Sequence, residues 1–550
     1  MHIRKTKRIN KDGTVREYLH LAESVRAKGA KYPREHALAP LGRVDQIQRG
    51  DFDALIRGLT AFSDLMALDP QQELFHDASV DIGHRVIVDR IWDKLGLSAV
   101  LRDVGISDRA CNAIKLMVLA RLEAPLSKRA THLRADRYLL PGERKPALDH
   151  LYEALDELEP VVAKVENGLF KRQYDTGPQA DLFHDKRLDV VFFDTTSIKL
   201  HHRGQGGLFQ HGYSKDHRPD LLQVMVGVVM TSAHEPICHY VFPGNTADTK
   251  AFTAALRDVK KRFPLRRVIL VADGGCAGRD ITAEIRELGL DYIVGARLRS
   301  DLTLRERVIN ARGVIGKWSI YDDKLTYKDV TVDDERYILV KNSEAEARDI
   351  AVRNAVLAKL KEKEGNSLKG LVKNRKYKQF LATDGEIRID PERVALAARF
   401  DGLWALRSNI RDIAATDLIE GYKTLWRVEQ WFDCLKSRLD AAPVFHWSER
   451  RVRAHIAVCF LAMKVWSVFR NALDLHLPGD ARPFDRWRAL GGLKGAVVTV
   501  QGNSYLVRAP VPEDALPVFA ALGTAPPKRI QNVAATPQDT HAHKVASTAT

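Results

Sequence analysis

The chain has 550 residues, and its 86 lysine and arginine residues outnumber its 71 aspartate and glutamate residues by 15. Hydrophobic residues make up 45% of it, which is typical of a folded protein and excludes a mainly disordered one. The five cysteines stand singly with no CxxC pair, so we expect neither a disulfide scaffold nor a cysteine zinc site, and a reducing cytoplasm fits this usage. No apolar run reaches the roughly 20 residues that a membrane helix needs, so no membrane partner is expected.

The positive charge is gathered in three places. Residues 1–50 hold twelve lysines and arginines against five acidic residues, and residues 359–378 hold eight against two. Between them lies a third group, formed by Lys128, Arg129 and Arg134. Any one such cluster can be ordinary solvated surface, but three in one chain favour a polyanionic partner, most simply nucleic acid.

The first part of the chain predicts a basic arm followed by a helical module. In residues 1–50, β-leaning residues follow a Lys-Asp-Gly turn signal, which predicts a hairpin. From 51 to 185, apolar residues recur at three- and four-residue spacing, which predicts an all-helical module. Within it, the basic segment 127–137 is the best candidate for a helix that contacts DNA.

The pattern then changes to mixed α/β. Apolar runs at 188–201, 221–232 and 237–244 predict three strands. They are followed by a helix, a strand, a helix and a strand, over 247–263, 266–275, 278–290 and 291–298. This order predicts one mixed sheet, whose first part spans 186–299.

The rest of the chain divides into four predicted parts. Residues 300–399 contain short β-like runs and a charged helix, which predict a β-rich insertion domain. Residues 400–475, with helical patterns at 413–439 and 450–475, predict a return to the core. A helix and a hairpin are expected over 476–522, and a disordered tail over 523–550.

Two carboxylates follow apolar strands in similar settings. Asp194 ends the run VVFFD, and Asp273 ends the run ILVAD. Because ligands bind at strand ends in α/β sheets, two such aspartates on neighbouring strands would suit a divalent metal, since Mg²⁺ prefers oxygen ligands. The alternative is that each aspartate only caps the turn that follows it.

A third acid for such a site is Glu429, on the helix predicted over 413–439. Tyr422 and Lys436 lie seven residues to either side, close to two helical turns, so all three share one face. A phenol and an ammonium beside a carboxylate suit a phosphodiester substrate. By spacing alone, however, Tyr422 and Lys436 are better explained as ordinary, partly exposed helix residues.

Four segments together resemble the catalytic blocks of a known family: FFDTTSIKL, PGNTADTKAF, VADGGCAGRDITAEIRELGLDYIVGARL and GYKTLWRVEQWFDCLKSRL. Their order and spacing are similar to those of bacterial insertion-sequence transposases of the DDE group whose helix carries a Tyr-Arg-Glu-Lys signature. The resemblance implies a ribonuclease-H-like α/β core, with a mixed sheet in two parts, 186–299 and 400–475, around the β-rich insertion. It also implies that Asp194, Asp273 and Glu429 are the catalytic, metal-binding triad.

One position departs from the signature, because its arginine falls on Leu425. Arg427 is nearby, but two residues before Glu429 it points roughly 200° away on a helix. Either Arg427 is a shifted substitute, or this phosphate contact is absent from the helix.

The resemblance implies a DNA transposase that binds the inverted repeats of its insertion sequence through the helical module. It would use two Mg²⁺ or Mn²⁺ ions per active site for strand cleavage and strand transfer. It would act on double-stranded end and target DNA as a homodimer, in the cytoplasm at the nucleoid. The residues predicted to contact DNA are Tyr422, Lys436, Arg427, Lys128, Arg129 and Arg134.

Two other functions remain open at this point. One is a non-catalytic DNA-binding repressor derived from a transposase, and the other is a nuclease of the same fold without strand transfer.

Overall fold

The computed structural model describes most of the chain and divides it into two compact units, each described here by itself. The described residues are 1–25, 34–48, 50–60, 75–140, 143–174, 190–201, 204–212, 214, 218–231, 235–263, 269–272, 279–296, 298, 308, 318–362, 368, 370–382, 387–423, 444, 446–479, 482–500 and 503–533. One unit is formed by Met1–Phe75 with Thr499–Gln501, and the other by His76–Val498 with Gly502–Thr550.

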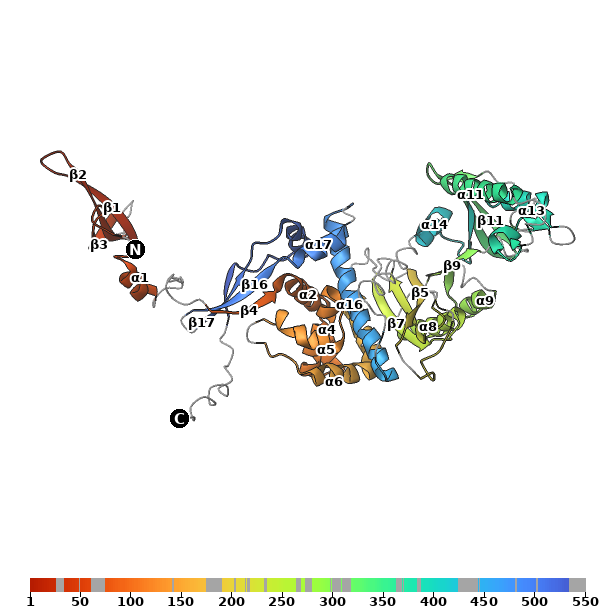
Figure 1. The fold of residues 1–550 in the computed structure, drawn as a ribbon, viewed down its shortest axis with the longest axis horizontal. Coiled ribbons are helices and arrows are strands. Elements are labelled where there is room, and N and C mark those ends of the chain that lie inside the picture. The colour runs from red at the N-terminus through yellow and green to blue at the C-terminus, as the bar shows by residue number, and fades with distance from the viewer. Residues whose placement is uncertain are drawn as a thin grey trace. The chain divides into compact units, whose positions relative to one another are not determined.

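The N-terminal unit is a small antiparallel sheet (Figure 1). Its strands are β1 (His2–Ile9), β2 (Val15–Val25) and β3 (Arg34–Arg43), and the helix α1 (Asp53–Thr60) follows. The predicted hairpin is therefore extended by a third strand, which the sequence pattern did not indicate. Among the described hydrophobic residues of this unit, Ala22 is the one that is buried.

The second unit begins with β4 (Phe75–Asp81), so the segment predicted as all-helical is not helical at its start. This strand joins a four-stranded sheet with three strands from the C-terminal part, β16 (Lys494–Val500), β17 (Asn503–Arg508) and β18 (Ile530–Val533). The tail predicted as disordered from residue 523 is thus ordered as far as β18, because backbone pairing with β17 satisfies its hydrogen bonds.

Helices then follow as predicted. They are α2 (Ile82–Leu95), α3 (Leu97–Asp103), α4 (Asp108–Glu123), α5 (Lys128–Arg134), α6 (Leu148–Leu158) and α7 (Val162–Tyr174). Ser107 and Ser127 cap α4 and α5, since each serine hydroxyl accepts a hydrogen bond from a backbone N–H three residues on.

The centre of this unit is a nine-stranded mixed sheet with the order β10-β11-β12-β15-β9-β8-β5-β6-β7. Strands β5 (Val190–Lys199), β8 (Ile269–Ala272) and β9 (Asp291–Ala296) run parallel, whereas β6 (Gln223–Thr231) and β7 (Pro236–Pro243) are antiparallel to their neighbours. The crossovers between parallel strands are the helices α8 (Asp248–Arg262) and α9 (Arg279–Glu287). This confirms the predicted mixed α/β core.

Part of the segment predicted as a separate insertion belongs to this same sheet. Strands β10 (Ser319–Ile320), β11 (Leu325–Val332) and β12 (Glu335–Asn342) continue it through β15 (Leu403–Ser408). A buried carboxylate on β12 links this strand to β9 and β15, because Glu335 accepts hydrogen bonds from Tyr292 and Arg407 at 2.6 Å each. The chain between β12 and β15 packs around a small core of its own and contains α11 (Ser343–Lys361), α12 (Arg375–Lys378), β13 (Leu381–Ala382), β14 (Arg388–Ile389) and α13 (Pro391–Ala398).

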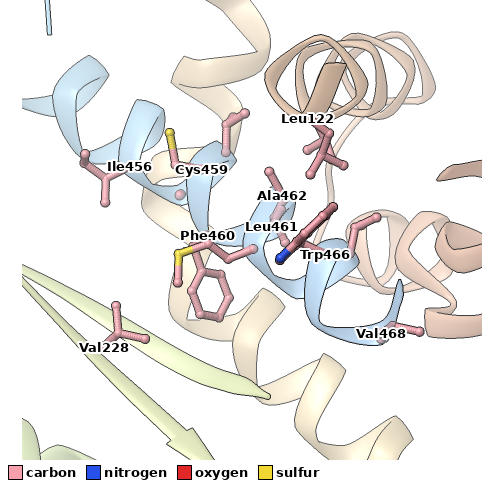
Figure 2. Close-up of a cluster of buried hydrophobic side chains, with 14 of the residues drawn as sticks. Leu122, Val228, Ile456, Cys459, Phe460, Leu461, Ala462, Trp466 and Val468 are labelled. Atoms are coloured by element: carbon pink, nitrogen blue, oxygen red, sulfur yellow. The ribbon is translucent and has the colours of Figure 1, made fainter. Parts of the chain in front are cut away.

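The helix α16 (Glu449–His476) packs against both the helical module and the sheet. Figure 2 shows it between α4, which carries Leu122, and β6, which carries Val228. By length and composition this helix is apolar enough to cross a membrane. The prediction that the chain contains no such apolar segment was therefore wrong. However, 94% of its apolar window is buried inside the unit, which is how a core helix packs. The remaining helices are α14 (Ala415–Lys423), α17 (Pro483–Leu490) and α18 (Leu516–Ala521).

Candidate active site and nucleic-acid interface

Asp194 lies within β5, near the point where a neighbouring strand ends. The sequence predicted it at the end of its strand, but β5 continues to Lys199 because β6 pairs with it along its whole length. On its other side β5 pairs with the parallel strand β8, and the last pair is Phe192 with Val271. Asp194 therefore lies two residues beyond the last residue of β5 that pairs with β8. Ligands bind beyond the ends of parallel strands in α/β sheets.

The carboxylate of Asp194 is half-buried and fixed by the backbone. The Thr195 N–H donates to its Oδ1 at 2.7 Å. The next three residues, Thr195, Thr196 and Ser197, are all buried, so this part of β5 is held from both sides. Such a carboxylate keeps its position without help from a ligand.

The other two members of the predicted triad, Asp273 and Glu429, lie outside the described residues. Among the residues that are described, no three His, Cys, Asp or Glu side chains are grouped closely enough to hold a metal. Asp194 is therefore the one predicted ligand whose surroundings are known.

Tyr422 lies near the end of α14, which packs against β8 and β9. Its ring stacks on Trp404 of β15, with the ring centroids 5.7 Å apart and the planes 26° from parallel. The phenol is thus half-buried and carried by the sheet. Arg427 and Lys436, the other two predicted DNA contacts on this helix, lie outside the described residues.

The chain returns to the same region at Val444. Its N–H donates to the carbonyl of Lys199 at 3.2 Å, and the His201 N–H donates to the carbonyl of Val444 at 3.1 Å. Lys199 is the last residue of β5, so Val444 lies beside the end of that strand. The helix α14, which precedes Val444 in the chain, contacts β8 and β9.

The three basic residues predicted on α5 have different surroundings. Arg129 is exposed and Arg134 is half-buried, but Lys128 is buried, so its ammonium does not reach the surface that Arg129 shares. Its Nζ lies 3.4 Å from His455 Nδ1 on α16. The sequence-based assignment of Lys128 as a phosphate contact therefore does not fit its position.

The surroundings of Lys128 destabilise its charged form. Burial, and then the charge of Arg121, lower the pKa of Lys128 to about 7. Burial and the charge of Lys128 also lower the pKa of His446 to about 4. The ring of His446 lies 5.4 Å from that of His455, and Cys459 Sγ lies 3.8 Å from His455 Nε2. This polar cluster joins α5 to the core helix, and no sequence signal indicated it.

A cavity of about 760 Å³ opens between α2, α4, α5 and the loop before α6. Five cations line it, but several are already neutralised by carboxylates. Arg85 contacts both Asp89 and Glu143, and Lys115 contacts Asp89. These ion pairs hold the helical module together, so the cavity is not a simple anion pocket.

Trp318, which directly precedes β10, is 41% exposed. Core packing therefore does not account for it.

The comparison with known families is clear. The family described as "Transposase DDE domain" matches residues 185–463, slightly more than half of the chain. Residues 3–71 match "IS1634 family transposase, N-terminal domain". The chain therefore belongs to the DDE transposases, a family of enzymes that cleave phosphodiesters.

Two solved structures are similar to parts of the chain. One is the cryo-EM structure of the piggyBac transposase synaptic complex with hairpin DNA, at 9% identity and a TM-score of 0.34, covering 70% of this chain and 79% of that one. The other is the Mos1 transposase paired-end complex with the left transposon end, at 14% identity and a TM-score of 0.14, covering 45% of this chain and 68% of that one. None of the curated proteins matches the chain.

Proposed function

We propose that this enzyme cuts DNA at the ends of its own insertion sequence and joins those ends to target DNA, with Asp194, Asp273 and Glu429 as the catalytic triad. The observation that carries this proposal is the position of Asp194 on β5, where the parallel strand β8 ends. The family membership supplies the phosphodiester chemistry.

The register of the parallel strands supports the pairing of Asp194 with Asp273. Phe192 pairs with Val271, and each predicted aspartate follows its strand residue by two positions. Because side chains alternate along a strand, residues two apart project to the same face. Asp194 therefore projects to the same face as Phe192, and Asp273 follows Val271, the partner of Phe192, by the same two positions in the sequence.

The anchoring of the chain on either side of Glu429 supports its inclusion. The segment that contains it starts at α14, which packs on β8 and β9, and ends at Val444, which pairs with the end of β5. One anchor therefore contacts β5, which carries Asp194, and the other contacts β8, whose last residue directly precedes Asp273 in the sequence.

These three carboxylates fit divalent cations, because Mg²⁺ and Mn²⁺ take carboxylate oxygens as ligands. Two such ions, when bound, would activate the attacking hydroxyl and neutralise charge on the phosphate. The task of the protein is then to hold the carboxylates in place and to orient the DNA. Tyr422 and Lys436 would contact phosphates beside the triad, and Arg427 would substitute for the arginine missing at Leu425 or pack elsewhere.

The DNA would be double-stranded, comprising the inverted repeats and the target, and a homodimer would hold two ends together at the nucleoid. Arg129 and Arg134 on α5 are the described cations of the helical module that suit this role. Their contacts to phosphate would fix the register of the DNA without reading its sequence.

The test is an assay of purified protein with a duplex that carries the inverted repeats flanking its reading frame, in Mg²⁺. Cleavage at the repeat ends, followed by joining to a second duplex, is the expected result. Cleavage without joining would favour the nuclease, and binding without cleavage would favour the repressor. Asp273→Asn and Glu429→Gln should each abolish both steps but leave binding intact.

A further inference from the structure

The N-terminal sheet has two chemically different faces. Residues directly opposite one another in an antiparallel pair project to the same side. In β1 and β2, Arg8 is opposite Arg16 and Arg4 is opposite His20. Tyr18, two residues from Arg16, is opposite Arg43 of β3. One side of the sheet, called here the arginine face, therefore carries Arg4, Arg8, Arg16 and Arg43.

The opposite side, called here the aliphatic face, carries apolar residues and two lysines. Ile3 is opposite Leu21, and Ile9 is opposite Val15. The lysines of this face are Lys5 and Lys7, and both form ion pairs with Glu17. Its positive charge is thus already matched within the sheet.

The arginine face has charge that the sheet does not balance. Arg4 contacts Glu35 and Arg43 contacts Asp45, but among the described residues neither Arg8 nor Arg16 forms an ion pair with a carboxylate. The two are exposed and directly opposite each other, and like charges in that position are destabilising. A bound anion between them would remove this repulsion.

We propose that the arginine face binds the phosphate backbone of duplex DNA. The inference rests on the proposed function for its choice of polyanion and adds the N-terminal sheet as a second contact surface. Guanidinium groups pair with phosphate oxygens through two parallel hydrogen bonds.

The residues between the arginines favour a duplex over two other anionic partners. Single strands are held by aromatic platforms on which bases stack, and Tyr18 is the one aromatic residue other than histidine on this face. An anionic membrane would need apolar side chains to insert, but Ile3, Ile9 and Val15 all lie on the opposite face. Cations on a rigid, regularly spaced sheet suit the regular phosphates of a double helix.

The experiment measures how salt affects the binding of the full-length protein to a duplex that carries its inverted repeat. The test variant is Arg8→Ala with Arg16→Ala, and the matched control is Lys5→Ala with Lys7→Ala. Both remove two charges from the same strands, but from opposite faces. Raising the salt from roughly 50 to 200 mM weakens DNA binding more when more phosphates are contacted. If the test variant lacks two phosphate contacts, this change should weaken binding by the wild type about tenfold more than binding by the variant.

The control should keep the wild-type salt dependence, and Arg8→Lys with Arg16→Lys should keep most of it because the charge remains. Circular dichroism confirms that the variants are folded. An equal loss in the test variant and the control would overturn the proposal, because the effect would be one of net charge alone. An unchanged test variant would also overturn it. Tighter binding to a single strand or to phosphatidylserine vesicles than to the duplex would assign the face to that other partner.

Cleavage of the inverted repeat separates this inference from the proposed function. If the wild type cleaves its ends and the test variant binds them normally, the inference fails and the proposed function stands. If the wild type binds no DNA, both fail.

Discussion

The two sheets of this transposase use the same backbone geometry for opposite purposes. In the central sheet all nine residues of β6 are buried, whereas in the N-terminal sheet almost every residue of β1 is exposed. A strand covered on both faces reads as a continuous apolar run and gives a rigid platform, on which Asp194 is fixed. A strand such as β1, whose residues are exposed on both sides of the sheet, leaves both faces available to partners. The difference fits our proposals, which assign the catalytic groups to the first sheet and an accessory DNA contact to the second.

The largest effect is expected at the catalytic edge of the central sheet. Asp194→Asn keeps the shape of the side chain but removes its charge, so cleavage should fall by about a thousandfold or more while DNA binding persists. Strand cleavage in Mg²⁺ and binding to the uncut end are the two measurements.

The matched control is Asp291→Asn. Asp291 begins β9 and pairs with Ile269, the first described residue of β8. It therefore lies at the opposite end of the parallel strands from Asp194. It should leave cleavage within a few-fold of wild type. If both variants lost activity equally, the loss would come from the sheet and not from a ligand.

The second prediction compares the cores of the two units. Phe460 of α16 is buried and stacks on His239 of β7 with ring centroids 4.8 Å apart, so Phe460→Ala should destabilise the second unit by about 3–5 kcal/mol. Ile9 is 73% exposed on the aliphatic face, so Ile9→Ala should change stability by no more than about 0.5 kcal/mol. Denaturant unfolding midpoints measure both. A large cost for Ile9→Ala would mean that another part of the assembly covers the aliphatic face.

The third prediction concerns the buried Lys128. Its pKa of about 7 in the folded protein is below the ordinary value of 10.5, so between these pH values the unfolded chain binds more protons. Stability should therefore rise with pH across this window, and the full penalty should apply below it. Lys128→Met removes the penalty and should stabilise the protein at neutral pH by up to roughly 4 kcal/mol, taking 1.36 kcal/mol per pH unit.

Arg129→Met is the control for this prediction, because Arg129 is the exposed neighbour on the same helix. It should leave the pH dependence of unfolding unchanged and weaken DNA binding slightly. Should Lys128→Met destabilise the protein at every pH, the ammonium would have a charged partner in the folded state and would not be held neutral.

The smallest effect is expected at Tyr422. Its ring is held by Trp404, so Tyr422→Phe keeps the packing and removes only the hydroxyl. Loss of one hydrogen bond to a charged phosphate is worth about 1.5–3 kcal/mol, so cleavage should slow by roughly ten- to a hundredfold. Single-turnover cleavage rates measure it, and an unchanged rate would mean that this residue only packs.

The core of the fold was accessible from the sequence because it follows local rules. Continuous apolar runs, such as the one that ends at Asp194, are typical of strands buried on both faces, and the helices between them show clear three- and four-residue periodicity. The same runs placed Asp194 on a strand of the central sheet. Its exact place within β5 was wrong because pairing with β6, a long-range contact, extends the strand.

The parts that were not accessible depend on contacts far apart in the chain. Lys128 is buried against His455, more than 300 positions later, so a basic helix that was predicted to contact DNA is partly internal. Strand β12 joins the central sheet through β15, and β18 is ordered through β17. No local pattern distinguishes such strands from an inserted domain or a tail.

The position of α16 also sets the order in which the protein folds as it is synthesised. The helices α2, α4 and α6 all pack against it, yet α16 leaves the ribosome roughly 300 residues after α4. At about 5–20 residues per second, the apolar surface of those helices waits about 15–60 s for its partner. Because β7 of the central sheet also contacts α16, the nascent chain completes the packing of neither the helical module nor the sheet until this helix emerges.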